Sequence, residues 1–123
     1  MTKRAHLVWR WIAEIARNPL IVDVVEDTIG PNILCWSTSL FTKEAHTDRF
    51  VSWYQDANHW GLYSSSVVSA CVALTPSTPL NDCMRFLPGS YLVRLVHENI
   101  EGTDNMLVCR QMITDSVDEA AAV

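Results

Sequence analysis

Residues 51–62 read Val-Ser-Trp-Tyr-Gln-Asp-Ala-Asn-His-Trp-Gly-Leu, and the fold that the sequence predicts is organised around this stretch. Residues 50–56 are expected to form a β-strand, in which residues two positions apart point to the same face. One face of this strand carries Phe50, Ser52, Tyr54 and Asp56. A turn follows the strand, and Gly61 is expected to supply an unusual backbone angle there.

The sequence on either side of this stretch predicts three more strands. Residues 33–43 alternate with a period of two and have one partly polar side. Residues 67–74 are a nearly continuous apolar run, as expected of a strand that is buried on both faces. Residues 83–87 predict a short strand, with a turn-rich connection over 75–82 before it and a Pro-Gly-Ser turn at 88–90 after it.

The N-terminal part of the chain predicts two helices. Apolar residues recur at helical spacing over residues 5–17 and again over 20–29. Asn18-Pro19 is expected to cap the second helix, and Gly30-Pro31 is expected to end it. The expected inner face of the second helix is made of Ile21, Val24, Val25 and Ile29. Helices followed by strands predict an α+β fold.

Composition limits the class of protein. The 123 residues are enough for one domain at most. With 49% hydrophobic and 19% charged residues, the composition is that of a globular protein. A net charge of −5 without a basic run argues against nucleic acid or an anionic membrane surface as a partner. The sequence shows neither an apolar run that could span a bilayer nor a signal peptide, so we expect no membrane association and a cytoplasmic location.

The four cysteines do not form a recognisable motif. They are Cys35, Cys71, Cys83 and Cys109, and no two are spaced as Cys-x-x-Cys. Each is expected to be a buried, reduced thiol, in preference to a zinc ligand or half of a disulfide.

Four motifs occur in an order and at a spacing typical of one enzyme family. Residues 53–56 read Trp-Tyr-Gln-Asp, where that family has Trp-His-Gln-Asp. Residues 41–44 match a Phe-x-Lys-Glu motif, and residues 68–74 follow Val-Thr-Ala-Trp-Ile-Ala-Leu. Residues 81–91 follow Asn-Gly-Cys-Met-Arg-Val-Ile-Pro-Gly-Ser-His, with Asp82 at the glycine position and tyrosine in place of the final histidine. On these motifs the chain resembles the phytanoyl-CoA dioxygenase family, which uses Fe(II), 2-oxoglutarate and O₂.

The resemblance implies a partial set of site residues. Asp56 matches the carboxylate ligand of iron, and Tyr54 stands where the first histidine ligand stands in the family. A phenol, with an ordinary pKa near 10, must lose a proton to coordinate a metal well. Lys43 matches the lysine near the co-substrate carboxylate, a favourable charge pairing. Cys71 matches a tryptophan that lines the 2-oxoglutarate pocket. No residue is assigned a catalytic role.

The remaining histidines do not complete the two-His-one-carboxylate centre. His46 belongs to a His-Thr-Asp sequence in a polar loop, which we interpret as a chance match, and His59 is expected to be a loop side chain. In the family the second histidine ligand and the arginine that pairs with 2-oxoglutarate lie beyond residue 123. The resemblance therefore predicts a truncated chain.

The family fold is a double-stranded β-helix of the jelly-roll or cupin kind. The resemblance implies one partial domain over residues 1–123, with helices over 5–29 and an incomplete β-rich core over 33–123. The open sheet edge is expected to pair with another copy or with a complementing chain. Three hypotheses remain open: part of an oxygenase that hydroxylates a small organic or acyl substrate but is impaired as an isolated chain, a non-catalytic relative that binds a partner, and a fragment without a function of its own.

Overall fold

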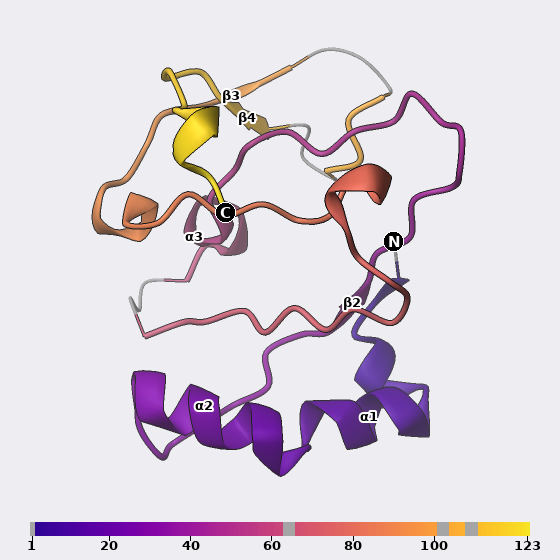
Figure 1. The fold of residues 1–123 in the computed structure, drawn as a ribbon. Helices are drawn as coiled ribbons and strands as arrows, with labels where there is room; N and C mark the ends of the chain where they lie inside the picture. Colours follow the sequence, from indigo (N-terminus) through magenta and orange to yellow (C-terminus); the bar gives the residue numbers. More distant parts are fainter. Residues whose placement is uncertain (1, 63–65, 101–103, 108–110) are drawn as a thin grey trace. The chain divides into compact units, whose positions relative to one another are not determined.

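The computed structural model describes residues 2–62, 66–100, 104–107 and 111–123. The chain forms two compact units, one made of Met1–His46 and Ser64–Val72 and the other of Thr47–Tyr63 and Ala73–Val123. Both are drawn in Figure 1. The first is called the N-terminal unit and the second the C-terminal unit.

In the N-terminal unit, a short strand and a 3₁₀ turn precede the first α-helix. A strand, β1 (Thr2–Lys3), leads into the 3₁₀ turn η1 (Ala5–Leu7), and the helix α1 (Arg10–Ala16) follows. The prediction of one helix over residues 5–17 is therefore wrong. Trp9 is extended, with φ −110° and ψ 116°. The backbone N–H groups of Ala5 and His6 donate to the backbone and the hydroxyl of Thr38, which holds this turn apart from the helix.

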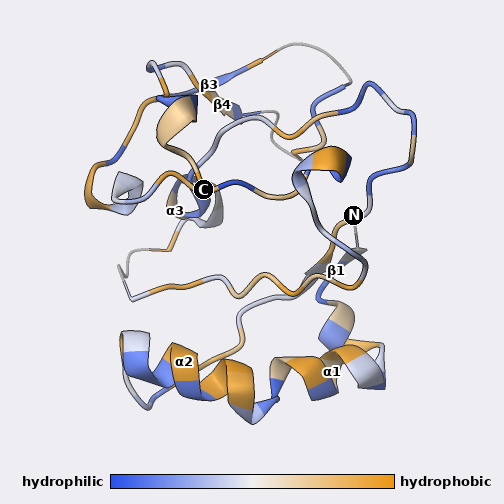
Figure 2. Cartoon of the chain, in the orientation of Figure 1, coloured by the Kyte–Doolittle hydropathy of each residue, from blue (hydrophilic) through white to orange (hydrophobic). Residues whose placement is uncertain are grey.

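The second helix, α2 (Pro19–Ile29), confirms the prediction at both ends. The Asn18 Oδ1 accepts a hydrogen bond from the backbone N–H of Leu20 at 3.0 Å, and Pro19 occupies the first turn. Gly30 follows the helix with φ 91°. Hydrophobic and hydrophilic residues alternate along α2, as Figure 2 shows. One part of the predicted inner face is wrong, because Val24 is 64% exposed.

The sheet of the N-terminal unit is small. The strand β2 (Ser39–Leu40) pairs antiparallel with β1, so that Thr2 lies opposite Leu40 and Lys3 opposite Ser39. The predicted strand over residues 33–43 therefore reduces to two residues. A strand requires a partner for its backbone, and β1 offers only two residues.

Residues 67–74 do not form the buried strand that their apolar sequence predicts. They have no regular secondary structure, and Val68, Val72 and Leu74 are 41%, 47% and 54% exposed. A strand that is buried on both faces needs neighbouring strands and a covering layer on each side. Within the described part of the chain, no strand pairs with this run.

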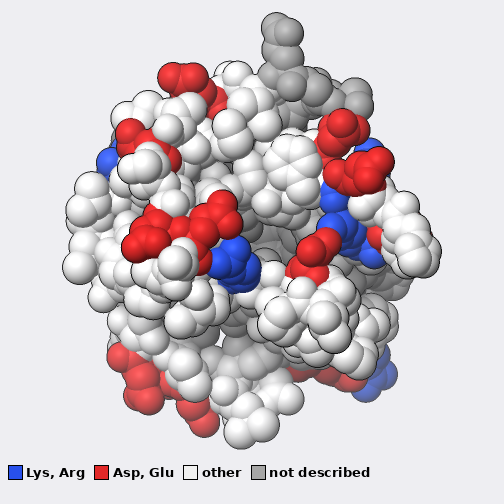
Figure 3. Space-filling view, turned by 45° about the horizontal axis from the view of Figure 1, so that its top comes forward, with Lys and Arg blue, Asp and Glu red and all other residues white. Residues whose placement is uncertain are grey.

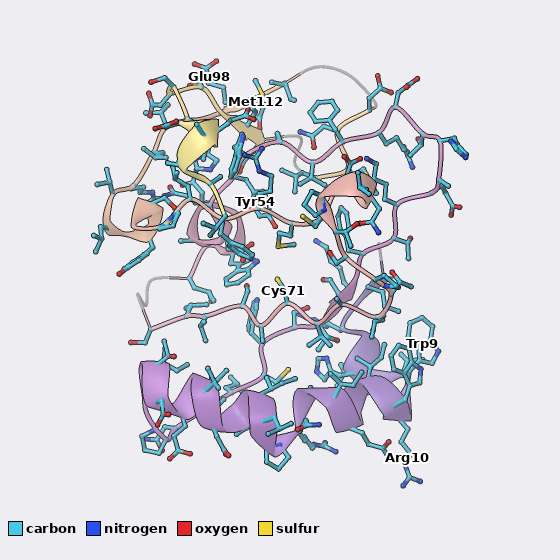
Figure 4. The ribbon with its side chains drawn as sticks, in the orientation of Figure 1. Trp9, Arg10, Tyr54, Cys71, Glu98 and Met112 are labelled. Carbon is cyan, nitrogen blue, oxygen red and sulfur yellow. The ribbon has the colours of Figure 1, made fainter. Side chains whose placement is uncertain are left out.

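The C-terminal unit contains the helix α3 (Asp56–Trp60) and an antiparallel pair of strands, β3 (His97–Asn99) and β4 (Gln111–Ile113). Glu98 lies opposite Met112 in this pair, and both are labelled in Figure 4. Short 3₁₀ turns complete the unit: η2 (Pro79–Asn81), η3 (Ser90–Leu92) and η4 (Glu119–Ala121).

The connection between residues 82 and 89 differs in part from the prediction. The turn positions are confirmed, because Asp82 and Gly89 have φ of 58° and 78°. The predicted strand over 83–87 is wrong. The backbone N–H of Phe86 instead donates to the carbonyl of Val123 at 2.7 Å, and the N–H of Val123 donates to the carbonyl of Phe86 at 2.8 Å. These two bonds join the segments at one residue pair and do not continue as a strand.

The buried core is small. Among the described residues, the buried apolar side chains are Ala5, Ile12 and Ile113, and the buried polar ones are Ser52 and Asn105. The prediction of buried thiols is wrong for two cysteines, because Cys35 and Cys71 are exposed and Cys83 is half-buried; Cys109 lies outside the described residues. The observed mixture of helices with small antiparallel sheets is an α+β fold. No helix in the described part is long and apolar enough to span a membrane.

Candidate functional site

The segment 50–55 is extended, and hydrogen bonds from two other segments hold it. The backbone N–H of Phe50 donates to the carbonyl of Asp104 at 3.0 Å, and the N–H of Met106 donates to the carbonyl of Phe50 at 2.9 Å. Further along, the N–H of Ile113 donates to the carbonyl of Trp53 at 3.0 Å. These isolated bonds replace the predicted continuous strand over residues 50–56.

A buried polar pair fixes the start of this segment. The Asn105 amide Nδ2 donates to the Ser52 hydroxyl at 2.9 Å, and that hydroxyl donates to the carbonyl of Gln111 at 2.7 Å. The Asn105 Oδ1 accepts from the N–H of Leu107 at 3.1 Å. Buried polar groups of this kind are costly unless they are paired, and both side chains here are paired.

Gln55 connects the segment to residues 90–95. Its side-chain Nε2 donates to the carbonyls of Ser90 and Val93, at 2.9 and 2.8 Å. Its Oε1 accepts from the backbone N–H of Leu95 at 3.0 Å. The half-buried amide of Gln55 therefore bonds residues 90–95 through both of its N–H donors and its oxygen acceptor. These bonds hold residues 90–95 against the extended segment.

His97 is bound through both ring nitrogens. The backbone N–H of Gln55 donates to Nε2 at 2.9 Å, and Nδ1 lies 3.0 Å from the carbonyl of Leu95. A carbonyl can only accept, so Nδ1 carries the proton and Nε2 supplies a lone pair, which defines a neutral ring. This imidazole is a structural link, because hydrogen bonds occupy both of its ring nitrogens.

The two candidate metal ligands lie next to Gln55. Asp56 is the first residue of α3, and Tyr54 lies two residues before it. Gln55 between them is extended, with φ −117° and ψ 126°. Both side chains are half-buried. The prediction that Asp56 lies on a strand is wrong. A carboxylate is favourable in the first turn of a helix. The helix α3 is followed by Gly61, whose φ of 61° confirms the predicted unusual backbone angle.

Tyr54 lines a pocket in the C-terminal unit with a volume of about 90 Å³. Its apolar walls include Leu87, Leu95 and Ile113, and Arg85 supplies the positive charge. Asp56 is not among the lining residues.

The residues present do not fit the iron centre that the family implies. That centre needs two imidazoles and one carboxylate. Within the described ranges, no three side chains of His, Cys, Asp or Glu come together as a metal site. The phenol at Tyr54 is a poor substitute for an imidazole, because it binds Fe(II) well only after it loses a proton.

The two candidate cofactor-binding residues belong to the N-terminal unit. Lys43 is exposed and follows β2, and Cys71 is exposed in the irregular run 66–72. Tyr54 and Asp56 belong to the other unit. His46, the predicted chance match, is an exposed turn residue with φ 58°. The backbone of His59 is part of α3 and not of a loop, and its side chain lies outside the described part.

Sequence reasoning missed four residues that build the C-terminal unit: Gln55, Arg85, His97 and Glu119. Gln55 and Arg85 both lie inside family motifs, which was the available signal. Nothing local marks His97 or Glu119, because their partners are 42 and 34 residues away. On the face shown in Figure 3, basic side chains lie among acidic ones.

The family model described as Phytanoyl-CoA dioxygenase (PhyH) matches residues 3–115. No curated protein and no solved structure shows significant similarity to the chain.

Proposed function

The chain belongs to the phytanoyl-CoA dioxygenase family, and from that premise we propose that it is a member without a complete iron centre, which does not turn over substrate as this chain alone. The family generally uses Fe(II) and 2-oxoglutarate. In this proposal Asp56 keeps the carboxylate position and Tyr54 occupies the first histidine position. Lys43 keeps its position near the co-substrate carboxylate, and Cys71 replaces a tryptophan that lines the co-substrate pocket in the family. A complete domain of this kind is a double-stranded β-helix that hydroxylates a small organic or acyl substrate.

The observation that carries the proposal is the chemistry of the donor set. Among the site residues that the resemblance implies, only Asp56 is of the kind that Fe(II) centres of this family use as a ligand. The imidazole of His97, whose Nε2 accepts from the backbone N–H of Gln55, already uses both nitrogens in hydrogen bonds. One carboxylate binds a divalent cation weakly in water, because it replaces a single water ligand. No catalytic step follows from such a site.

A thermal unfolding experiment tests this proposal. The chain is melted under anaerobic conditions, with and without Mn(II) (a redox-stable substitute for Fe(II)) and 2-oxoglutarate. A ligand at 100 times its dissociation constant stabilises a protein by about 2.7 kcal/mol. For a chain of this size, roughly 4 °C per kcal/mol is expected, so real binding shifts the midpoint by about 10 °C.

We expect no shift for the wild-type chain. A shift of that size which disappears in Asp56→Ala, and persists in the matched control Asp23→Ala on the exposed side of α2, would show a working site and refute the proposal. A missing shift in a cooperative melt supports it. A melt without cooperativity would instead favour a fragment that has no function of its own.

A second candidate, a module that pairs with another chain, rests on a specific observation. Val68 and Val72 lie in one extended apolar run of the N-terminal unit and are 41% and 47% exposed. An apolar run of this kind is normally covered by a neighbouring strand or layer, and an added strand from a second chain would cover it.

Light scattering of the purified chain tests this second candidate. A defined dimer or heteromer that dissociates in the double variant Val68→Thr/Val72→Thr supports pairing through this run. A monomer at concentrations around 100 μM, or a dimer that the double variant leaves intact, contradicts it.

A further inference from the structure

The pocket of the C-terminal unit combines apolar walls with one fixed cation. Leu87, Leu95, Ile113 and Val117 contribute apolar side chains, and Arg85 is the only cationic residue among the described residues that line it. An apolar cavity of about 150 Å³ holds one benzene ring of six carbons. By that comparison, the volume of about 90 Å³ holds a hydrocarbon chain of about three carbons.

The cation is positioned by an aromatic ring. The Arg85 guanidinium carbon lies 5.6 Å from the centre of the Trp53 ring, within the range of a cation–π contact. The planar guanidinium keeps its charge at any physiological pH and presents a rigid fork of N–H donors. The indole N–H of Trp53 adds a further donor on the same side.

These donors already hold a carboxylate. The Arg85 Nη1 donates to the Glu119 Oε2 at 3.2 Å, and the indole Nε1 of Trp53 donates to the Glu119 Oε1 at 3.3 Å. The Arg85 Nη2 also donates to the backbone carbonyl of Glu119. Glu119 itself does not line the pocket. The chain thus supplies its own anion to two donor residues, Arg85 and Trp53, that also line the pocket.

The internal contact is weak enough to be replaced. The side chains of Arg85 and Glu119 are 44% and 63% exposed, and exposed ion pairs contribute little because water and salt screen them. An external carboxylate can accept from the same two donors, the Arg85 Nη1 and the Trp53 Nε1. If it also carries a short apolar tail, burial of that tail in the pocket adds a contribution that Glu119 lacks.

We propose that Arg85 and Trp53 form a binding site for short-chain monocarboxylates, with the hydrocarbon tail in the pocket and Glu119 as an internal competitor. Butyrate is the probe whose tail best matches the volume. The site requires no metal and does not depend on Tyr54 or Asp56 as ligands, so it stands whether or not the chain binds iron.

The test is an NMR titration of the full chain, which follows the indole N–H signal of Trp53 with acetate, propionate, butyrate and hexanoate. From acetate to butyrate, each added methylene should tighten binding about fourfold, the factor that corresponds to about 0.8 kcal/mol per buried CH₂. Hexanoate should gain no further factor, because its tail exceeds the pocket. Butanamide, which has the same shape without the charge, should not bind.

Variants test the competitor. Glu119→Gln removes the internal carboxylate charge and should tighten butyrate binding by about two- to fivefold, the range expected for an exposed ion pair. Glu98→Gln makes the same charge change on β3, at a residue that does not line the pocket, and should leave binding unchanged. Arg85→Lys keeps the charge but loses the fork, and should weaken binding severalfold.

Arg85→Gln should abolish binding. Equal affinity for acetate, butyrate and butanamide would overturn the proposal even if that variant failed to fold, because the comparison uses the wild-type chain. Tightening of the same size in Glu98→Gln and Glu119→Gln would overturn it as well, since the effect would then be one of net charge.

Discussion

Replacing Gln55 with glutamate tests how the C-terminal unit is held together. The substitution keeps the size of the side chain and its acceptor for the Leu95 N–H, but removes the two N–H bonds to the carbonyls of Ser90 and Val93. A carboxylate then faces two carbonyl oxygens. Each lost hydrogen bond costs about 1 kcal/mol, and an acceptor left without a donor adds to this.

We expect Gln55→Glu to lower the free energy of unfolding by about 2–3 kcal/mol. The midpoint of thermal unfolding should fall by roughly 8–12 °C, at about 4 °C per kcal/mol for a chain of this size. Circular dichroism and urea unfolding measure both quantities. Gln111→Glu is the matched control, because Gln111 is also half-buried and its side chain makes no hydrogen bond within the described residues.

Amide exchange separates the contribution of the acceptor from that of the donors. Gln55→Ala removes all three side-chain bonds, so the Leu95 N–H loses its partner and should exchange faster than in Gln55→Glu, which keeps that bond. If Gln55→Glu and Gln111→Glu agree within about 0.5 kcal/mol, the Gln55 amide does not hold the loop and the reasoning is refuted.

Three further changes should act through local causes. Ser52→Ala leaves the Asn105 amide and a backbone carbonyl without a partner and should cost about 1–3 kcal/mol in urea unfolding, whereas the exposed Ser116→Ala should stay within about 0.5 kcal/mol; equal effects would contradict the buried pair. Gly89→Ala should cost about 1 kcal/mol or more through backbone strain alone, because φ is 78° and no atom lies within 4 Å of the added carbon; a stabilised variant would disprove this. Asn18→Ala should cost about 0.5–2 kcal/mol by removing the cap of α2, measured as lost helical circular dichroism on heating, and an unchanged melt would argue against the cap.

Features that depend on neighbouring residues were predictable from the sequence. Asn18-Pro19 and Gly30 defined α2 because a cap bond and a positive φ involve residues only a few positions apart. Gly61 and Asp82 were identified as turn residues for the same reason. The resemblance to the dioxygenase family, which the family match confirms, rested on motifs that are also local.

Features that depend on distant partners were not predictable. Residues 67–74 have the apolar composition of a buried strand, but composition cannot say whether neighbouring strands exist. The ion pair of Arg85 with Glu119 and the bond of Gln55 to His97 join residues 34 and 42 positions apart. Asp56 was placed on a strand because alternation was extended one residue too far, to the residue where α3 begins.

Hydrogen bonds of Gln55 hold the segment around Tyr54 against residues 90–97. In a working iron centre, ligands at positions 54 and 56 would tie this segment to the rest of the domain through the metal. Here the Gln55 side chain and its backbone N–H bind residues 90–97 through hydrogen bonds that involve neither the Tyr54 nor the Asp56 side chain. A different side chain at position 54 would therefore leave these bonds intact.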